Sequence, residues 1–314
     1  MIIFLVTADH RYTHQRLLTE TGGPDVAILF YHELFANAQV PAGTYVFTDF
    51  DRFSFWQLEV ATETFRVIKS SGSLTLNDPG RVRQRYALLR QLQREGINRF
   101  GVYRVEAGEM PERYPVFLRS EDSHQGPVSE LLADSDALKA AIDDVLTKGE
   151  VPERHLIAVE YAAEPTPEGV FRKMAAYRIG DRIVPTPAVH QRSWIAKEGE
   201  RGAASEALYR QENEEMRSNP FRDVLMRAFS IANIEYGRAD FSMVAGNVQI
   251  YEINTNPALP QGNIQHPSEA RRDSREYSWK EYISALRAID TTGGSAITLE
   301  GPKLQRWRTV FGGP

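Results

Sequence analysis

The sequence contains no cysteine among its 314 residues, and this absence excludes several classes of site at once. Disulfides, thiolate zinc sites and cysteine nucleophiles all require the thiol group. A chain without thiols also fits the reducing cytoplasm, which is the compartment we expect for this protein. Any functional site must therefore be built from other side chains.

Long apolar runs are also missing. The runs "MIIFLV" and "DVAILFY" both end at charged or polar residues, far short of the ~20 apolar residues that a membrane helix needs. No basic residue precedes the first run and no small-residue cleavage site follows it, so we predict a buried strand there and not a signal peptide. We expect a soluble protein with no membrane partner.

The sequence has no excess of basic residues and no common nucleotide-binding motif. Its 37 Lys and Arg residues stand against 42 Asp and Glu residues, for a net charge of -5, so we predict no nucleic-acid surface. Neither G-x-x-x-x-G-K-[ST] nor G-x-G-x-x-G occurs, which argues against P-loop and Rossmann proteins. A G-x-S-x-G nucleophile elbow is absent as well.

The length allows two or three lobes, because single cores stop growing near ~250 residues. Short apolar runs alternate with polar stretches over residues 1–75, which predicts a small α/β lobe. The turn-forming sequence "NDP" then indicates a lobe boundary. We expect a second lobe over 76–155 and a third over 156–290. The Gly-rich tail 291–314 shows no apolar period, so we predict an extended arm that packs back or stays free.

Within the second and third lobes, apolar periodicity and turn residues predict individual elements. An amphipathic helix is expected over about 81–95, with a stop at Gly96, and a strand over 116–119. A hairpin should turn at Gly180 and Asp181, because both residues suit positive φ. The other expectations are a strand in "HLIAVEYAAE" and two helices separated at Asn219 and Pro220.

The stretch "YGRADFSMVAGNVQIYEINTNPALP" carries an unusual polar pattern. We predict an antiparallel hairpin that turns through 245–247 and is centred on Gly246. Asp240 then lies opposite Glu252, and Arg238 lies opposite Asn254. Because side chains alternate along a strand, these four residues share one face. The other face should belong to the core and holds Ala239, Phe241, Tyr251 and Ile253.

Two carboxylates in opposed positions need a countercharge, since their Cβ atoms are only ~5 Å apart. A divalent cation can supply it, and Asp240, Glu252 and the amide of Asn254 are hard oxygen ligands of the kind that Mg²⁺ takes beside nucleotide phosphates. The alternative is a solvated face on which Arg238 alone neutralises both acids. The polar loop that follows, "NTNP", places this face at a strand end, which favours a site.

Arg238, Asp240, Glu252, Asn254 and Pro257 together resemble the last core motif of the ATP-grasp superfamily. These are carboxylate-amine ligases such as D-alanine-D-alanine ligase, glutathione synthetase and the ribosomal-protein glutamate ligases. The resemblance implies an α/β (α+β) ATP-grasp fold, in which a small N-terminal α/β lobe is followed by two α+β lobes that clasp ATP. It covers approximately the second and third lobes.

The resemblance also implies roles for these residues. Asp240, Glu252 and Asn254 would hold two Mg²⁺ ions, with Mn²⁺ as a substitute, and Arg238 would steady the transferring phosphoryl group. Where the superfamily has two phosphate-binding lysines, this sequence has Arg85 and Arg119. Arginine keeps the charge but is not equivalent to lysine, and Arg85 alone would also suit a helix surface.

Further positions follow in family order. Glu160 stands where the ribose hydroxyls are bound. One of Arg172 and Lys173, and one of Arg192 and Lys197, would reach the phosphates. The loop "SEDSHQG" occupies the place of a Gly-rich flap but has one glycine and carries a histidine at position 124, which would be solvated or would meet a phosphate on closure.

The activity implied by the resemblance is transfer of a phosphoryl group from ATP to a substrate carboxylate, followed by attack of an amine or other nucleophile on the acyl phosphate. Arg238 and Arg119 would be the catalytic residues. The partners would be ATP, a small carboxylate and an amine acceptor enclosed by the first lobe, and a homodimer is one option for the assembly. The alternatives are a kinase of the same fold, a non-catalytic ATP-binding module and a Mg²⁺-dependent hydrolase.

Two acids of the first lobe allow two interpretations. Asp49 and Asp51 follow the predicted strand in "VFTDFDR". They could lie at a lobe interface, but the pattern favours simple capping residues.

Overall fold

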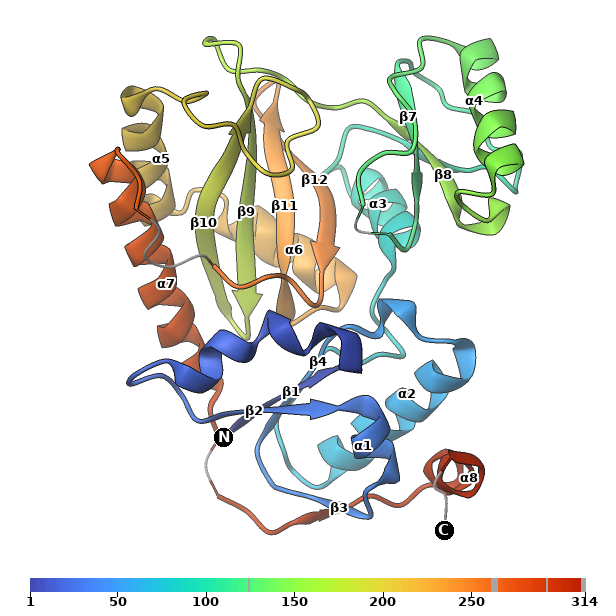
Figure 1. Cartoon of the computed structure of the whole chain (residues 1–314), viewed down its shortest axis with the longest axis vertical. Coiled ribbons are helices and arrows are strands. Elements are labelled where there is room, and N and C mark those ends of the chain that lie inside the picture. Colours follow the sequence, from blue (N-terminus) through green and yellow to red (C-terminus); the bar gives the residue numbers. More distant parts are fainter. Residues whose placement is uncertain (124, 261–264, 292, 312–314) are drawn as a thin grey trace.

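The computed structural model describes residues 1–123, 125–260, 265–291 and 293–311, which form three lobes (Figure 1). The first lobe contains a parallel sheet of strand order β2-β1-β4-β5. Its elements are β1 (Ile2–Val6), β2 (Val26–Phe30), α1 (Tyr31–Ala36), β4 (Thr44–Phe47), α2 (Phe55–Ser70) and β5 (Thr75–Leu76), with 3-10 segments η1 (Ala8–Thr13), η2 (Gln15–Thr19) and η3 (Phe50–Arg52). The predicted α/β character of this lobe is confirmed.

The tail after residue 290 packs back on the protein, one of the two options that the sequence left open, but it is not extended throughout. Strand β13 (Ile297–Thr298) pairs with β3 (Gln39–Val40), and helix α8 (Pro302–Phe311) packs on α1 and α2. Leu304 and Trp307 are buried in the core of the first lobe. Their spacing is helical, but a helix this short gives too brief an apolar period to stand out from a Gly-rich segment.

Replacing Trp307 with alanine should lower the free energy of unfolding by about 3 kcal/mol, because the indole fills a buried site. The ring lies 5.2 Å from those of Phe35 and Trp56 and 4.4 Å from that of Phe311, measured between centroids. Urea unfolding measures the change. The matched variant Gln305→Ala, at an exposed position of the same helix, should change stability by less than about 0.5 kcal/mol. An equal effect of both variants would contradict the docking of α8.

The second lobe is a small antiparallel sheet of order β6-β8-β7 with its own core. Its elements are α3 (Arg85–Arg94), β6 (Val102–Arg104), β7 (Val116–Ser120), α4 (Ser135–Lys148), η4 (Glu153–His155) and β8 (Leu156–Glu160). Helix α3 begins four residues later than the sequence predicted. The preceding backbone is held extended, because Arg83 N donates to Ala232 O and the Asn233 side chain donates to Arg81 O, both at 3.0 Å.

The third lobe is built on an antiparallel sheet of order β10-β9-β11-β12. Its elements are β9 (Phe171–Ile179), β10 (Arg182–Gln191), α5 (Glu206–Ser218), α6 (Arg222–Ala232), β11 (Tyr236–Val244), β12 (Asn247–Asn254) and α7 (Glu269–Ile289). The β9–β10 hairpin and the break between α5 and α6 confirm the prediction. Helices α5 and α7 flank the β10 edge, and the second lobe stands beyond β12 (Figure 1).

Shared cores and one buried asparagine hold the lobes together. Helix α3, α6 and both α+β sheets contribute to one apolar cluster. The buried Asn77 side chain donates to Phe47 O and Tyr236 O, and its Oδ1 accepts from the backbone of Glu235 and Tyr236. This asparagine therefore ties the first sheet to the start of β11 and fixes where β11 and β12 meet the first lobe. In the described ranges, no helix is long and apolar enough to cross a membrane.

Candidate functional site

The β11–β12 hairpin has the cross-strand register that the sequence predicted at its polar end. Asp240 pairs with Glu252, and Arg238 pairs with Asn254. The turn itself is shorter than expected, because only Ala245 and Gly246 connect the strands, with φ of 47° and 73°. The residue pairs between the turn and Phe241 are therefore shifted by one residue from the predicted register. A β-bulge between Asp240 and Phe241 restores the predicted register for the polar pairs.

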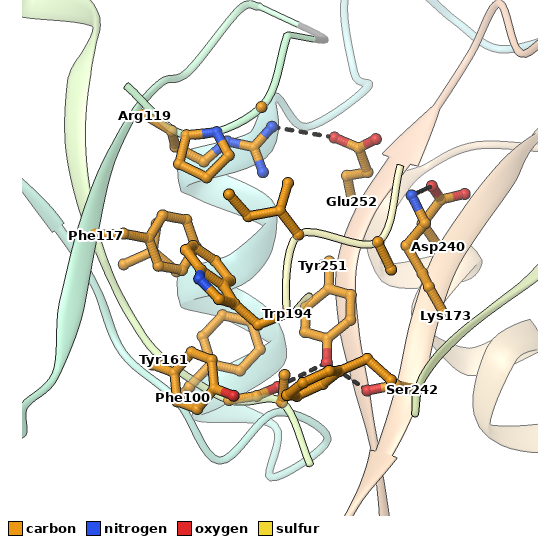
Figure 2. Close-up of a pocket in the computed structure, with 18 of the residues that line it drawn as sticks. Phe100, Phe117, Arg119, Tyr161, Lys173, Trp194, Asp240, Ser242, Tyr251 and Glu252 are labelled. Carbon is orange, nitrogen blue, oxygen red and sulfur yellow. Dashed lines mark hydrogen bonds and ion pairs between the residues drawn. The ribbon is translucent and has the colours of Figure 1, made fainter. Parts of the chain in front are cut away.

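The bulge lies at Tyr251, which the sequence placed in the core. Its ring does pack against the core cluster, and it also lines a pocket between the second and third lobes (Figure 2). The hydroxyl donates to Ala162 O at 2.6 Å and forms a second hydrogen bond with the Ser242 hydroxyl. The extra residue in β12 therefore sits where the core cluster borders the pocket.

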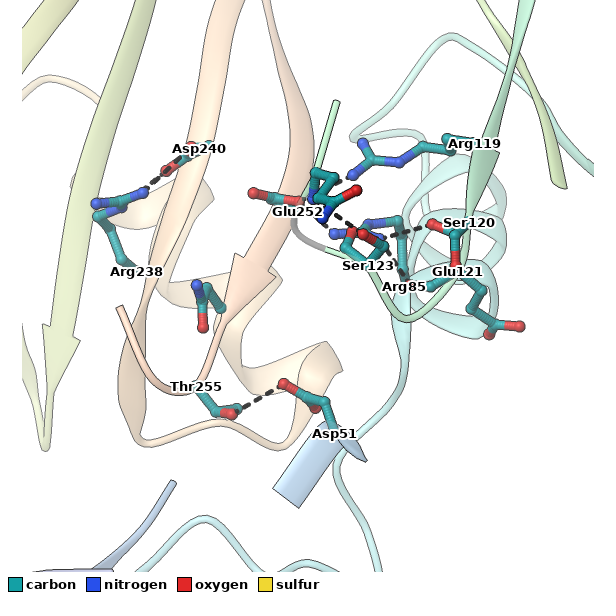
Figure 3. A network of polar contacts seen from close by, with 12 residues as sticks. Asp51, Arg85, Arg119, Ser120, Glu121, Ser123, Arg238, Asp240, Glu252 and Thr255 are labelled. Atoms are coloured by element: carbon teal, nitrogen blue, oxygen red, sulfur yellow. Dashed lines mark hydrogen bonds and ion pairs between the residues drawn. The ribbon is translucent and has the colours of Figure 1, made fainter. Parts of the chain in front are cut away.

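Two arginines of the second lobe meet Glu252 from across the pocket (Figure 3). Arg85 Nη2 pairs with Glu252 Oε2, and Arg119 Nη2 lies 3.4 Å from the same oxygen. Arg85 is buried, with 9% of its surface exposed, so it is not the helix-surface charge that the sequence also allowed. Burial together with the neighbouring Arg85 lowers the pKa of Arg119 to about 10, which leaves it protonated at neutral pH.

Asp240 is neutralised from its own sheet. Arg238 Nε donates to Asp240 Oδ1 at 2.9 Å, and Lys173 Nζ of β9 lies 3.2 Å from Oδ2. The carboxylate of Asp240 raises the pKa of Arg238 above its usual range. The carboxylates of Asp240 and Glu252 are thus each paired with two cationic side chains, four cations in all. This excess of positive charge suits a polyanionic ligand.

A metal ion would find only part of a coordination shell in these residues. In the part of the chain that the structure describes, no group of three or more His, Asp or Glu side chains could hold a metal. Asp240, Glu252 and the Asn254 amide offer hard oxygens, and Asn254 Oδ1 accepts from Asn256 N at 2.8 Å. Such a set fits Mg²⁺ that brings further ligands with it, as it does when phosphates accompany the ion.

The pocket beside these charges is aromatic (Figure 2). Trp194 lies between Phe117 and Tyr161, with ring centroids 5.1 and 5.7 Å away. Phe100 and Tyr251 line the same pocket, and Arg119, Lys173, Asp240 and Glu252 close one end. Trp194 itself was not predicted as a site residue, only the basic residues around it. A single tryptophan in a polar loop was the signal that could have pointed to it.

The remaining predicted basic residues separate into two groups. Lys173 and Lys197 line the pocket, and so does Arg172, although its guanidinium is paired with Glu215 of α5 at 2.6 Å. Arg192 is exposed, is not among the residues that line this pocket and pairs with Glu200. Arg192 is therefore the member of this set that does not line the pocket.

Glu160 also lines the pocket, but its carboxylate is occupied by the protein itself. It accepts from Gly101 N at 2.7 Å, from the Tyr103 hydroxyl at 2.9 Å and from Arg113 Nη2 at 2.6 Å. These contacts connect the end of β8 to the turn before β6. Glu164 lines the pocket as well, and its carboxylate accepts from Ala245 N at 2.7 Å. Glu164 was not among the residues predicted for the site.

The loop that follows β7 is anchored in a way that the sequence did not reveal. Arg85 Nη1 donates to the carbonyl oxygens of Ser120, Glu121 and Ser123 at 3.0, 2.6 and 2.9 Å. Gln125 and Gly126 of the same loop line the pocket, whereas His124 lies outside the described residues. The arginine that pairs with Glu252 thus also holds the loop above it.

No protein-family model matches the sequence, and no curated protein matches it. Solved structures do match the fold. D-alanine-D-alanine ligase from Bacillus anthracis aligns over 92% of this chain and 96% of its own, with a TM-score of 0.53 and 12% identity. The same enzyme complexed with ATP gives a TM-score of 0.52 at 11% identity, again over 92% and 96% of the two chains.

The ATP-grasp ligase PsnB, complexed with a phosphomimetic variant of its minimal precursor, Mg and ADP, aligns over 91% of this chain and 96% of its own. Its TM-score is 0.51 and its identity 14%. These likenesses show that the chain has the ATP-grasp fold, which confirms the fold predicted from the resemblance.

Proposed function

We propose that the chain is an ATP-dependent ligase, which activates a substrate carboxylate as an acyl phosphate and transfers the acyl group to an amine or another nucleophile. The observation that carries the proposal is the polar hairpin face. It presents Asp240, Glu252 and Asn254 at the charged end of an aromatic pocket, where Arg85, Arg119, Arg238 and Lys173 gather.

ATP fits the polarity of this pocket. Its base would lie among Trp194, Phe117 and Tyr161, because aromatic faces stack on bases. Its phosphates would then point toward the cations around Asp240 and Glu252. The backbone that follows β8 lines the same pocket at residues 161–163 and could read the edge of the base.

Asp240, Glu252 and Asn254 would hold the Mg²⁺ that accompanies ATP, and we propose two ions, for which Mn²⁺ could substitute. Bound Mg²⁺ would offset charge on the phosphate oxygens during transfer. Arg85 and Arg119 pair with Glu252 in this structure, so nucleotide binding would break these two ion pairs. The two arginines would turn to phosphate oxygens, and Glu252 would become available as a ligand.

The residues of the chain would act in both steps by position and charge. In the first step a carboxylate oxygen attacks the γ-phosphorus of ATP, the bond to ADP breaks, and Arg119 and Arg85 stabilise the charge on the transferring group. In the second step a nucleophile attacks the acyl carbon and phosphate leaves. Arg238, fixed by Asp240, would hold the acyl phosphate between the steps. No covalent bond to the protein is required.

The proposal is tested by incubation with ATP, Mg²⁺ and the twenty standard L-amino acids, with ADP and new amides measured by mass spectrometry. Hydroxylamine added in place of an amine should trap an acyl phosphate as a hydroxamate. We expect ADP release that depends on the amino acids, with an amide or hydroxamate as product. A stable phosphorylated product without any amide would favour a kinase, and ATP binding without ADP release would favour a non-catalytic module.

Replacing Trp194 with alanine should raise the Kd for ATP about 10- to 100-fold, since stacking of a base on an aromatic ring is worth ~1–3 kcal/mol. Calorimetric titration with ATP and Mg²⁺ measures the change. The matched variant Phe55→Ala removes an aromatic ring that is 78% exposed in the first lobe, and should leave the Kd unchanged. Unchanged affinity in Trp194→Ala would place the base elsewhere.

A further inference from the structure

The parallel sheet of the first lobe reverses the direction of its strand order between its two central strands, β1 and β4. In the order β2-β1-β4-β5, the next strand after β1 in the chain, β2, lies on one side of β1, and β4 lies on the other side. Open α/β sheets bind ligands at such a point, where the direction of the strand order reverses. Here Thr7 directly follows β1, and Asp49 follows β4. The fold thus places both residues at the position where a ligand of this lobe is expected.

Asp49 does not act as the capping residue that the sequence favoured. It stands before η3 without a side-chain capping bond and has a φ of 57°. Its Oδ2 instead accepts from Thr7 N at 2.9 Å, from the Thr7 hydroxyl and from His10 Nδ1 at 2.8 Å. The carboxylate is 6% exposed and the imidazole 14% exposed. These contacts of Asp49 lie within the first lobe, whereas Asp51 accepts from Thr255 of the third lobe and so is the acid at the lobe interface.

The hydrogen bonds of His10 define which nitrogen carries the proton. Arg52 Nη1 lies 2.5 Å from His10 Nε2 and 3.4 Å from Nδ1, so we assign its hydrogen bond to the nearer Nε2, and a guanidinium can only donate. Nε2 is therefore the acceptor, and Nδ1–H donates to Asp49. This is the arrangement of a histidine base that a carboxylate orients, with its lone pair directed away from the carboxylate.

The segments that carry His10 and Asp49 contact the loop that follows the hairpin of the proposed ATP site. The Thr13 hydroxyl, at the end of η1, donates to Asn256 Oδ1 at 3.0 Å. Asp51 accepts from the Thr255 hydroxyl at 3.3 Å and lines a small cavity together with Arg85 and Glu252 (Figure 3). The loop that leaves Asn254 thus lies directly against the segments that carry His10 and Asp49.

We infer that His10, oriented by Asp49, binds the amine of the acceptor and removes a proton from it before the second step. The inference rests on the proposed ligase function. Lysine side chains and α-amino groups titrate near ~10.4 and ~8, so such an acceptor arrives as an ammonium and cannot attack until it loses a proton.

The step balances with the groups named. His10 Nε2 takes one proton from the ammonium, and the amine nitrogen forms the bond to the acyl carbon. The bond from that carbon to the phosphate oxygen breaks, and the departing phosphate takes the second proton from nitrogen. His10 then releases its proton to solvent. For the amine to reach Nε2, Arg52, whose side chain is exposed, has to swing away.

The test compares two nucleophiles in the variant His10→Asn, whose amide can keep the hydrogen bond to Asp49 but has no basic nitrogen. With the twenty standard L-amino acids, we expect amide formation to fall about 100-fold, the usual contribution of a general base. With hydroxylamine, which is unprotonated at neutral pH, hydroxamate formation should stay within about twofold of the wild type. Asp49→Asn should show the same selective loss, and the exposed Asp9→Asn should show none.

Each other outcome overturns the inference. An equal loss with both nucleophiles would make His10 a structural residue or one needed for the first step. No loss with either would remove it from the reaction. Absence of ADP release in the wild type would overturn the proposed ligase function and this inference with it, and that result is distinct because it does not depend on any variant.

Discussion

Replacing Glu252 with glutamine is expected to reduce ADP release by about 10²- to 10³-fold, the range found when one charge-stabilising group is removed from an active site. Glutamine keeps the size of the side chain but loses the charge that pairs with Arg85 and Arg119. It also loses one of the two carboxylates proposed to hold Mg²⁺. A coupled assay of ADP at saturating ATP, with amino acids and hydroxylamine, measures the rate.

The matched variant is Glu214→Gln, an exposed position on α5 of the same lobe. It should release ADP at the rate of the wild type. Because removal of one partner from a buried pair destabilises a protein, the unfolding midpoint of Glu252→Gln has to be measured as well. A folded Glu252→Gln variant with undiminished ADP release would contradict the assignment of this carboxylate.

Replacing Arg119 with methionine should lower ADP release by about 10²- to 10³-fold as well, because the variant loses a partly buried cation that we propose to face the transferring phosphoryl group. Arg119 is held close to the site by Glu252 at 3.4 Å and by its place on β7, so a neutral side chain of similar length leaves the surroundings intact. The same ADP assay applies, with the Kd for ATP measured in parallel.

Two further variants separate the charge from the shape of this side chain. Arg119→Lys should recover most of the activity, since lysine binds phosphate as a point charge, although it lacks the planar fork. Arg227→Met removes a surface arginine that pairs with Glu95 at 2.7 Å and should have no effect. If Arg119→Lys were as inactive as Arg119→Met, the fork of the guanidinium would be essential, and the position would not be equivalent to a lysine.

The polar register of the hairpin was predictable because strand alternation and a two-strand pairing leave few choices. Asp240 opposite Glu252 follows from a turn near Gly246 and the period of two. The bulge was not predictable, since nothing local distinguishes an extra residue in β12 from a longer turn. For the same reason the sequence placed Tyr251 in the core, where it does pack, but did not show that it also lines the pocket.

Other parts of the site depend on tertiary contacts that no local pattern encodes. Arg85 lies on the amphipathic helix where a surface charge would also fit, and only the fold brings Glu252 and the loop after β7 to it. Glu160 was recognisable as an unusual carboxylate on an apolar strand, but its bonds to Gly101 and Arg113 come from distant segments. The fold itself was predictable from the resemblance, because the matching residues occur in the same order as in the superfamily and lie on whole strands and helices.

The most direct test of the central claim is calorimetric titration of ATP with and without Mg²⁺, on the wild type and on Glu252→Gln. If Asp240, Glu252 and Asn254 hold the ion that accompanies ATP, Mg²⁺ should tighten ATP binding by about 10-fold or more in the wild type, which corresponds to about 1.4 kcal/mol. The variant should bind ATP with an affinity that Mg²⁺ no longer improves. Equal tightening by Mg²⁺ in both proteins would contradict the account.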